Sequence, residues 1–224
     1  MNHAAALSTN APVVSTVVSP PPRLGRVQKR RRHVVALLST LVLLPLMLLS
    51  GSAWTDGGAL HAAIETVGLL LAVACVIGRV ACTLYIGGRK SAELITVGPY
   101  SVSRNPLYFF SLLGTIGLGL MAGSLAAGAT FGLVYFLVFD RLIRREEAFL
   151  AASFPSSFGA YCDCTPRWLP RLSIWRSVDE ISVRPRLLLN TLRDASVFVL
   201  MFPVLESIEW AQQAQWLPVL LRLP

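Results

Sequence analysis

Uncharged apolar stretches divide most of this sequence into segments with the length of membrane spans. Val34–Ser50 has 17 residues without a charge, Leu60–Ile86 is a second apolar stretch, and Leu107–Phe139 runs for 33 residues without a charged side chain. A transmembrane helix needs about 20 predominantly apolar residues. The pattern therefore predicts an all-α fold, a polytopic integral membrane bundle of about four to five spans.

The longest of these stretches exceeds a single span and predicts two short helices. Met121–Ser124 contains the natural break, which leaves arms of about 15 residues, or about 22 Å, against about 30 Å for a bilayer core. Gly119 with Gly123, and Gly128 with Gly132, permit close helix approach, although glycine is also simply common in membrane helices. We expect a tight helical hairpin that thins the membrane or is shielded by neighbouring helices.

The remaining segments divide the chain further. A disordered tail is expected before the first span, because no apolar core precedes its terminal basic cluster. Leu187–Leu205 contains Arg193 and Asp194 and predicts either a fifth span or an interfacial helix. The residues after it suit a membrane surface. The expected organisation is a tail over 1–33, two transmembrane helices over 34–86, a core with the hairpin over 87–170, and an extra membrane-associated segment over 171–224.

Composition and charge support a membrane location. The chain is 54% hydrophobic and 14% charged, with a net charge of +8, whereas soluble domains carry about 25% charged residues. Basic residues flank the apolar stretches, so the positive-inside rule predicts a cytoplasmic N-terminus in a bacterial inner membrane, and no nucleic-acid partner. The flanking residues are Arg26, Lys29, Arg30, Arg31, Arg32, Arg89, Lys90, Arg141, Arg144 and Arg145.

The cysteines predict no metal centre. Cys162 and Cys164 lie two positions apart without a nearby histidine, which falls short of a zinc site. We expect unpaired thiols on a reducing cytoplasmic face.

Polar and aromatic motifs occur in a fixed order around the hairpin. Each alone has a structural reading: adjacent glutamates beside arginines suit a solvated helix end, and tyrosines suit a membrane interface. Together they resemble the isoprenylcysteine carboxyl methyltransferase family and related membrane phospholipid methyltransferases, over roughly Gly87 to Pro170. The motifs are Gly98-Pro-Tyr100, Arg104-Asn105-Pro106-x-Tyr108, the hairpin, Glu146-Glu147-x-x-Leu150, Phe158-Gly159-x-Tyr161 and Pro166-Arg-Trp-Leu-Pro170.

The resemblance implies a membrane enzyme that uses S-adenosylmethionine at the cytoplasmic face and methylates a lipid-like or isoprenylated acceptor. The cofactor-binding residues that it implies are Ala92, Glu93, Leu94, Ile95, Tyr100, Asn105, Pro106, Leu107, Tyr108 and Glu146. Arg104, Asn105 and Glu146 are the expected catalytic group, and Arg79, Arg141 and Arg145 are candidates for the substrate.

The chemistry of the donor agrees with these positions. Glu146 can accept a hydrogen bond from the α-amine, and the faces of Tyr100 and Tyr108 can stabilise the sulfonium cation by about 0.5–2 kcal/mol. Arg104 can hold either a carboxylate or the loop itself. Methyl transfer requires positioning and exclusion of water more than acid–base chemistry.

Three features depart from the family pattern. The usual histidine is Asn105, which forms hydrogen bonds but carries no proton. Phe158-Gly159-Ala-Tyr161 is one residue short, and the expected substrate arginine falls on Leu142, where Arg141 or Arg145 could substitute. Arg79, inside a span, either extends to the headgroups or lines a substrate path.

Three alternatives remain open at the level of sequence. The first is a phospholipid N-methyltransferase, the second an NADPH-dependent membrane reductase, and the third a non-catalytic membrane protein on the same scaffold. Binding of the methyl donor separates the first from the other two. A soluble methyltransferase of the dinucleotide-binding type is disfavoured, because no glycine-rich strand–turn–helix fingerprint occurs.

Overall fold

The computed structural model describes residues 50–53, 58–87 and 93–223. Several predictions therefore lie outside the described residues. These are the N-terminal tail with its basic cluster, the span over Val34–Ser50 apart from its last residue, the anchoring Arg89 and Lys90, and the cofactor residue Ala92.

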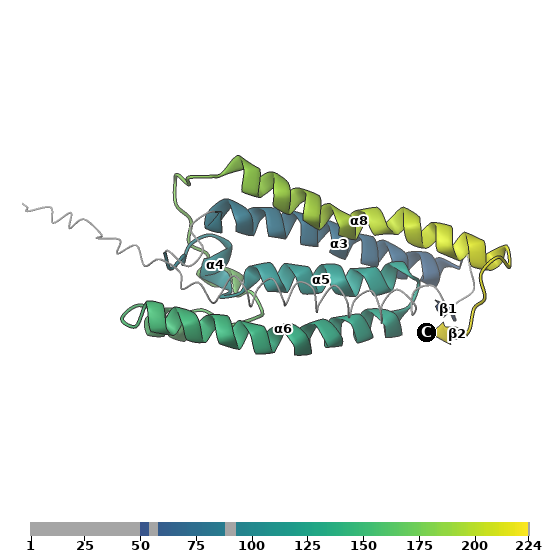
Figure 1. Cartoon of the computed structure of the whole chain (residues 1–224), viewed down its shortest axis with the longest axis horizontal. Coiled ribbons are helices and arrows are strands. Elements are labelled where there is room, and N and C mark those ends of the chain that lie inside the picture. The colour runs from purple at the N-terminus through teal and green to yellow at the C-terminus, as the bar shows by residue number, and fades with distance from the viewer. Residues whose placement is uncertain (1–49, 54–57, 88–92, 224) are drawn as a thin grey trace, which may run out of the picture.

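Four helices run lengthwise beside one another in the described part of the chain (Figure 1). They are α3 (Ala59–Ile86), α5 (Pro106–Met121), α6 (Leu125–Ser153) and α8 (Pro185–Gln213). Helix α3 packs against both α5 and α8, and α5 also packs against α6. Each of the four contributes one residue to a buried apolar cluster, namely Ala72, Met121, Phe131 and Leu205.

The all-α membrane bundle predicted from the sequence is confirmed. Helices α3, α6 and α8 are long and apolar enough to cross a membrane, and α5 is a shorter apolar helix. Leu187–Leu205 lies inside α8, which continues to Gln213, through residues that their composition had suggested for a membrane surface.

The helical hairpin has its break where the sequence predicts it, between Met121 and Leu125. Ser124 begins α6 by accepting a hydrogen bond on its side chain from the backbone amide of Ala127, at 3.0 Å. Gly119 lies directly against the second arm: a β-carbon there would be 2.3 Å from the backbone nitrogen of Gly128. The close approach of the two backbones therefore depends on these glycines.

Short elements connect and close the bundle. Helix α4 (Pro99–Val102), helix α7 (Phe158–Cys164) and the 3₁₀ helix η2 (Leu172–Ile174) belong to the segments between the long helices. Figure 1 places α4 at one end and the strands β1 (Ser50–Ser52) and β2 (Leu221–Leu223) at the other. The strands form a parallel pair, with Ser50 opposite Leu221.

Candidate active site

The predicted loop before α5 packs against a segment that follows α7. The hydroxyl of Ser103, in the loop, donates a hydrogen bond to the carbonyl of Trp168 at 3.0 Å. Hydrogen bonds of this kind join two segments that lie about 65 residues apart in the sequence, and they supply partners for buried polar groups. Backbone hydrogen bonds run from Arg104 to the Pro166 carbonyl (2.8 Å), from Arg171 to the Val102 carbonyl (2.9 Å) and from Gly98 to the Arg176 carbonyl (2.7 Å).

Gly98 sets the direction of this loop. Its backbone has φ 60° and ψ −135°, a conformation that residues with a β-carbon rarely adopt. A β-carbon would also lie 2.4 Å from the ring of Tyr85 at the end of α3. The following Pro99 has its φ fixed by its ring and begins α4. Glycine at this position lets the loop pass close to α3 and turn into α4.

A buried carboxylate, Glu147 of α6, is the centre of the site. Its Oε1 accepts a hydrogen bond from Asn105 Nδ2 at 3.0 Å and lies 3.3 Å from Arg104 Nε. Its Oε2 accepts from Arg167 Nε at 3.0 Å and lies 2.9 Å from Arg167 Nη2. The side chain is only 10% exposed. Both carboxylate oxygens therefore hold segments that are far apart in the sequence.

Asn105 is an anchor in this arrangement. Besides Glu147, its Nδ2 donates to the Arg167 carbonyl at 3.3 Å, and the residue is buried. Its amide thus joins the start of α5 to both α6 and the segment after α7. The hydrogen bond to Glu147 raises the pKa of Arg167, and nearby acidic charge adds to the effect, so this guanidinium stays charged.

Two tyrosines are buried beside this cluster. The hydroxyl of Tyr161 in α7 donates to the Tyr100 carbonyl at 2.6 Å. Burial raises the pKa of both phenols well above the usual value, and Glu146 and Tyr108 are close enough to Tyr100 to raise its pKa further. The phenols of Tyr100 and Tyr161 therefore stay neutral. Glu146 and Tyr108, both predicted to bind the cofactor, lie near Tyr100.

Aromatic side chains join α6 to the neighbouring elements. The ring of Tyr108 packs against Phe139, with centroids 5.6 Å apart. Trp168 packs on Phe136 at 5.0 Å and donates its Nε1 proton to Asp140 at 3.1 Å. The closing Pro-Arg-Trp-Leu-Pro motif therefore contacts α6 through both its arginine and its tryptophan.

The predicted residues divide between this cluster and its periphery. Arg104 and Asn105 meet at Glu147, whereas Glu146 is half-buried on the neighbouring position of α6. Tyr100 and Pro106 are buried, Leu94, Ile95, Leu107 and Tyr108 are half-buried, and Glu93, Arg141 and Arg145 are exposed. Their functional roles stay predictions.

Arg79 contacts a neighbouring helix. Its Nη1 donates to the hydroxyl of Ser111 on α5, and the residue is half-buried. Its guanidinium therefore faces the packing between α3 and α5. A role in a substrate path stays a prediction.

Sequence reasoning missed two residues of the cluster. Glu147 stands beside the predicted Glu146, and helix geometry places adjacent residues about 100° apart around the axis, but the sequence did not identify the buried one. Arg167 lies inside the closing motif, which was the available signal. In the structure, Arg167 and Glu147 contact each other directly.

Comparisons with known proteins give one family match and two similar proteins. Residues 64–157 match the phospholipid methyltransferase family, a range that includes Arg104, Asn105 and both glutamates but ends before Arg167. The chain is 38% identical over 194 residues to the nickel-cobalt-cadmium resistance protein NccN of Alcaligenes xylosoxydans xylosoxydans, covering 86% of this chain and 91% of NccN. It is 37% identical over 180 residues to the cobalt-zinc-cadmium resistance protein CzcN of Cupriavidus metallidurans, covering 80% and 82%. No solved structure matches.

Proposed function

Because this chain belongs to the phospholipid methyltransferase family and is similar to NccN and CzcN over most of its length, we propose that it is an integral membrane methyltransferase. It uses S-adenosylmethionine and methylates a lipid-like or isoprenylated acceptor. The observation that carries the proposal is the junction at Glu147, where residues from three separate family motifs meet.

The residues around the junction suit the methyl donor. When bound, the donor supplies an electrophilic methyl group on a sulfonium. Glu146 is a half-buried carboxylate near Tyr100, and it accepts hydrogen bonds from the α-ammonium group of the donor in this proposal. Tyr108 offers an aromatic face to the sulfonium, an attraction that grows as water is excluded. Residues 93–95, before α4, and residues 106–107, at the start of α5, complete the contacts with the donor in this proposal.

Glu147, Arg104, Asn105 and Arg167 act as positioning residues. They hold the loop over 98–105 against α6, so that the side chains that contact the donor are ordered before it binds. Such preorganisation lowers the entropic cost of reaching the in-line geometry of methyl transfer. Asn105 serves this role without exchanging a proton, and its replacement of the family histidine is compatible with transfer that relies on positioning.

The charge distribution supports a cytoplasmic site in a bacterial inner membrane. Most of the described arginines belong to elements at the α4 end of the bundle, whereas Arg222 is in strand β2, which Figure 1 shows at the opposite end. By the positive-inside rule, the α4 end faces the cytoplasm. The arginines on the elements at that end are Arg141, Arg144, Arg145, Arg167, Arg171, Arg176, Arg184 and Arg186.

The acceptor reaches the site from the membrane in this proposal. Arg141 and Arg145 are exposed on α6 within two turns of Glu147, where they can attract an acidic headgroup or carboxylate. Arg79 lies deeper, between α3 and α5. An amine acceptor, as in phospholipid N-methylation, is the alternative within the same class.

Donor binding tests the proposed function. In calorimetry on the detergent-purified protein, Glu146→Gln and Tyr108→Ala are each expected to weaken binding of S-adenosylmethionine. For Glu146→Gln we expect about a tenfold loss, because the amide oxygen can still accept a hydrogen bond from the ammonium group but lacks the negative charge of the carboxylate. Cys162→Ala is the matched control and should bind as the parent does.

Three outcomes would contradict the assignment. Equal donor binding by Glu146→Gln, Tyr108→Ala and Cys162→Ala would remove the donor from this site. Binding of NADPH in place of S-adenosylmethionine and its demethylated product would favour the reductase alternative, and binding of neither by folded protein would favour a non-catalytic scaffold.

The names of NccN and CzcN concern resistance to metal ions, and we propose that this chain contributes to such resistance through methylation. A strain that lacks the chain is expected to grow less well on nickel, cobalt or cadmium salts, with growth restored by the parent chain but not by Glu146→Gln. Equal restoration of growth by the parent chain and by Glu146→Gln would show that resistance does not depend on the methyl-donor site.

A further inference from the structure

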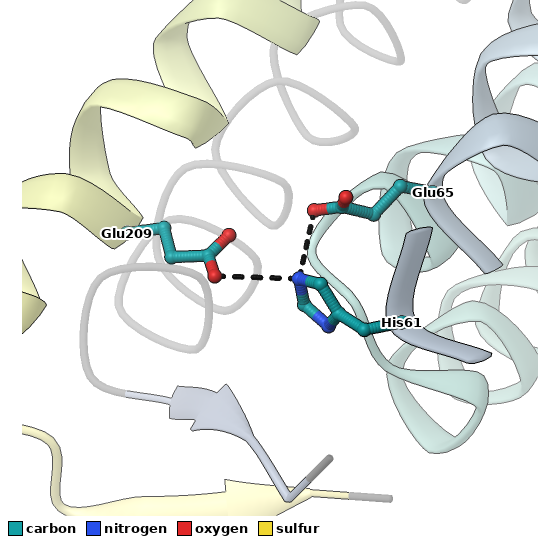
Figure 2. Close-up of side chains that lie close together, drawn as sticks. All are labelled: His61, Glu65 and Glu209. Carbon is teal, nitrogen blue, oxygen red and sulfur yellow. Dashed lines mark ion pairs between the residues drawn. The ribbon is translucent and has the colours of Figure 1, made fainter. Parts of the chain in front are cut away.

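A histidine and two carboxylates meet at the end of the bundle opposite the candidate active site (Figure 2). His61 Nε2 lies 3.1 Å from Glu65 Oε1 and 3.3 Å from Glu209 Oε1. One ligand atom from each residue lies within 4.8 Å of the other two. Figure 2 shows the imidazole between the two carboxylates, one from its own helix and one from α8.

The fold brings these residues together from distant parts of the chain. His61 and Glu65 are one turn apart on α3 and therefore share a helix face. Helix α8 runs antiparallel to α3, which brings Glu209, near its end, level with the first turns of α3. Along α3, His61 is about 36 Å from Tyr85 at the candidate active site, at 1.5 Å per residue.

The cluster is withdrawn from solvent and rich in negative charge. The side chains of His61 and Glu65 are 5% and 14% exposed, and that of Glu209 is 27% exposed. Glu65 Oε1 is fully buried, and no donor among the described residues is aligned for a hydrogen bond to it. Glu206 acts electrostatically on Glu65 as well, and Gln213 Nε2 contacts Glu209 Oε1 at 3.4 Å. A divalent cation would be attracted to these carboxylates.

The two distances from His61 and the donor set match a divalent transition metal ion. Bonds of about 2.0–2.2 Å from nitrogen and oxygen ligands to one ion place neighbouring ligand atoms about 3.0–3.5 Å apart. Both distances from His61 Nε2 fall within this range. Two carboxylates neutralise a doubly charged ion, and the imidazole favours zinc, nickel and related ions over magnesium or calcium.

We propose that His61, Glu65 and Glu209 bind one divalent transition metal ion, with water in the remaining coordination positions. Binding uses the lone pair of His61 Nε2, so the imidazole coordinates the ion in the form that has no proton on this nitrogen. The cysteines had predicted no metal centre, and Glu209 is too far from His61 in the chain for a local sequence pattern to connect them. The site is independent of the proposed methyl transfer.

The test uses a parent chain that lacks the other two histidines and the two cysteines of α7. The chain has three histidines, so His3→Ala and His33→Ala leave His61 as its single imidazole, and Cys162→Ser with Cys164→Ser removes the two thiols outside the helical bundle. The full chain is purified in detergent without a polyhistidine tag. Cobalt(II) is followed by visible absorption, and zinc by calorimetry, with magnesium as a control ion.

We expect this parent chain to bind one cobalt or zinc ion and to melt at a higher temperature as the metal concentration rises. His61→Ala and Glu209→Gln should each lower the affinity, by at least about 100-fold for His61→Ala, because the remaining ligands are too few to hold the ion. Glu180→Gln, which removes an exposed carboxylate in the segment before α8, away from the cluster, should bind as the parent does.

The outcomes separate a metal site from a purely structural ion pair. Absence of one-to-one binding in the folded parent would overturn the proposal. So would binding by Glu209→Gln and His61→Ala with the affinity of Glu180→Gln, even if both variants melt at a lower temperature in the presence of a chelator. Glu209→Gln preserves the shape of the side chain, so loss of its cobalt spectrum in a variant that melts like the parent without metal would support the site.

Discussion

Glu147→Ala is expected to lower the free energy of unfolding by about 3–5 kcal/mol, because it removes the carboxylate that several buried donors share. Arg104 and Asn105 lose their contact with α6, and Arg167 loses both of its contacts with the carboxylate. The side chain is 10% exposed, so water replaces these interactions only in part. Thermal unfolding in detergent measures the loss.

The same substitution is expected to abolish measurable donor binding, because the loop over 98–105 is no longer held against α6. Glu146→Gln should differ from it by weakening donor binding with little change in melting temperature. Asp194→Asn is the matched control, since Asp194 pairs with Arg193 at the surface, where the side chains are 56% and 78% exposed. Surface pairs contribute about 0–1 kcal/mol. A similar melting temperature for Glu147→Ala and Asp194→Asn would contradict the central role of Glu147.

Gly98→Ala is expected to lower the free energy of unfolding by about 3 kcal/mol and to weaken donor binding as well. The backbone conformation of Gly98, with φ 60° and ψ −135°, strains any residue with a β-carbon by about 1–3 kcal/mol. The added methyl group would also lie 2.4 Å from the Tyr85 ring, and such overpacking costs about 1–3 kcal/mol. To relieve the strained backbone or the clash with Tyr85, the loop that carries Tyr100 has to shift.

Two variants make this prediction specific. Gly159→Ala in α7 is the matched control, because a β-carbon there meets nothing within 4 Å, and alanine is the better helix former. Tyr85→Ala combined with Gly98→Ala should recover only part of the loss, since it removes the clash but leaves the strained backbone. Gly98→Ala with the stability and donor affinity of Gly159→Ala would show that the loop tolerates another conformation.

The sequence predicted the membrane bundle and the hairpin because both depend on local properties. Charge is costly in a bilayer wherever the residue lies, so uncharged stretches indicate spans directly. The break near Ser124 could be read in the same way, from chain length against bilayer thickness. The order of the motifs around the hairpin was enough to identify the family.

The candidate active site was predictable only in part. Arg104 and Asn105 were recognised, but the choice between Glu146 and Glu147 depends on how α6 is rotated relative to the loop. That rotation is set by packing against α5 and by the contacts of Trp168 with Phe136 and Asp140. Arg167 required knowledge of the path of the chain after α7.

The sequence by itself determined the apolar helices, the hairpin and the family, since each of them depends on the residues within short stretches of chain. The tertiary structure alone decided which carboxylate is buried, which arginine reaches it from 20 residues away, and that Glu209 of α8 meets His61 of α3. These contacts join residues far apart in the chain, and their existence depends on the register and rotation of packed helices, which local patterns of polarity leave open.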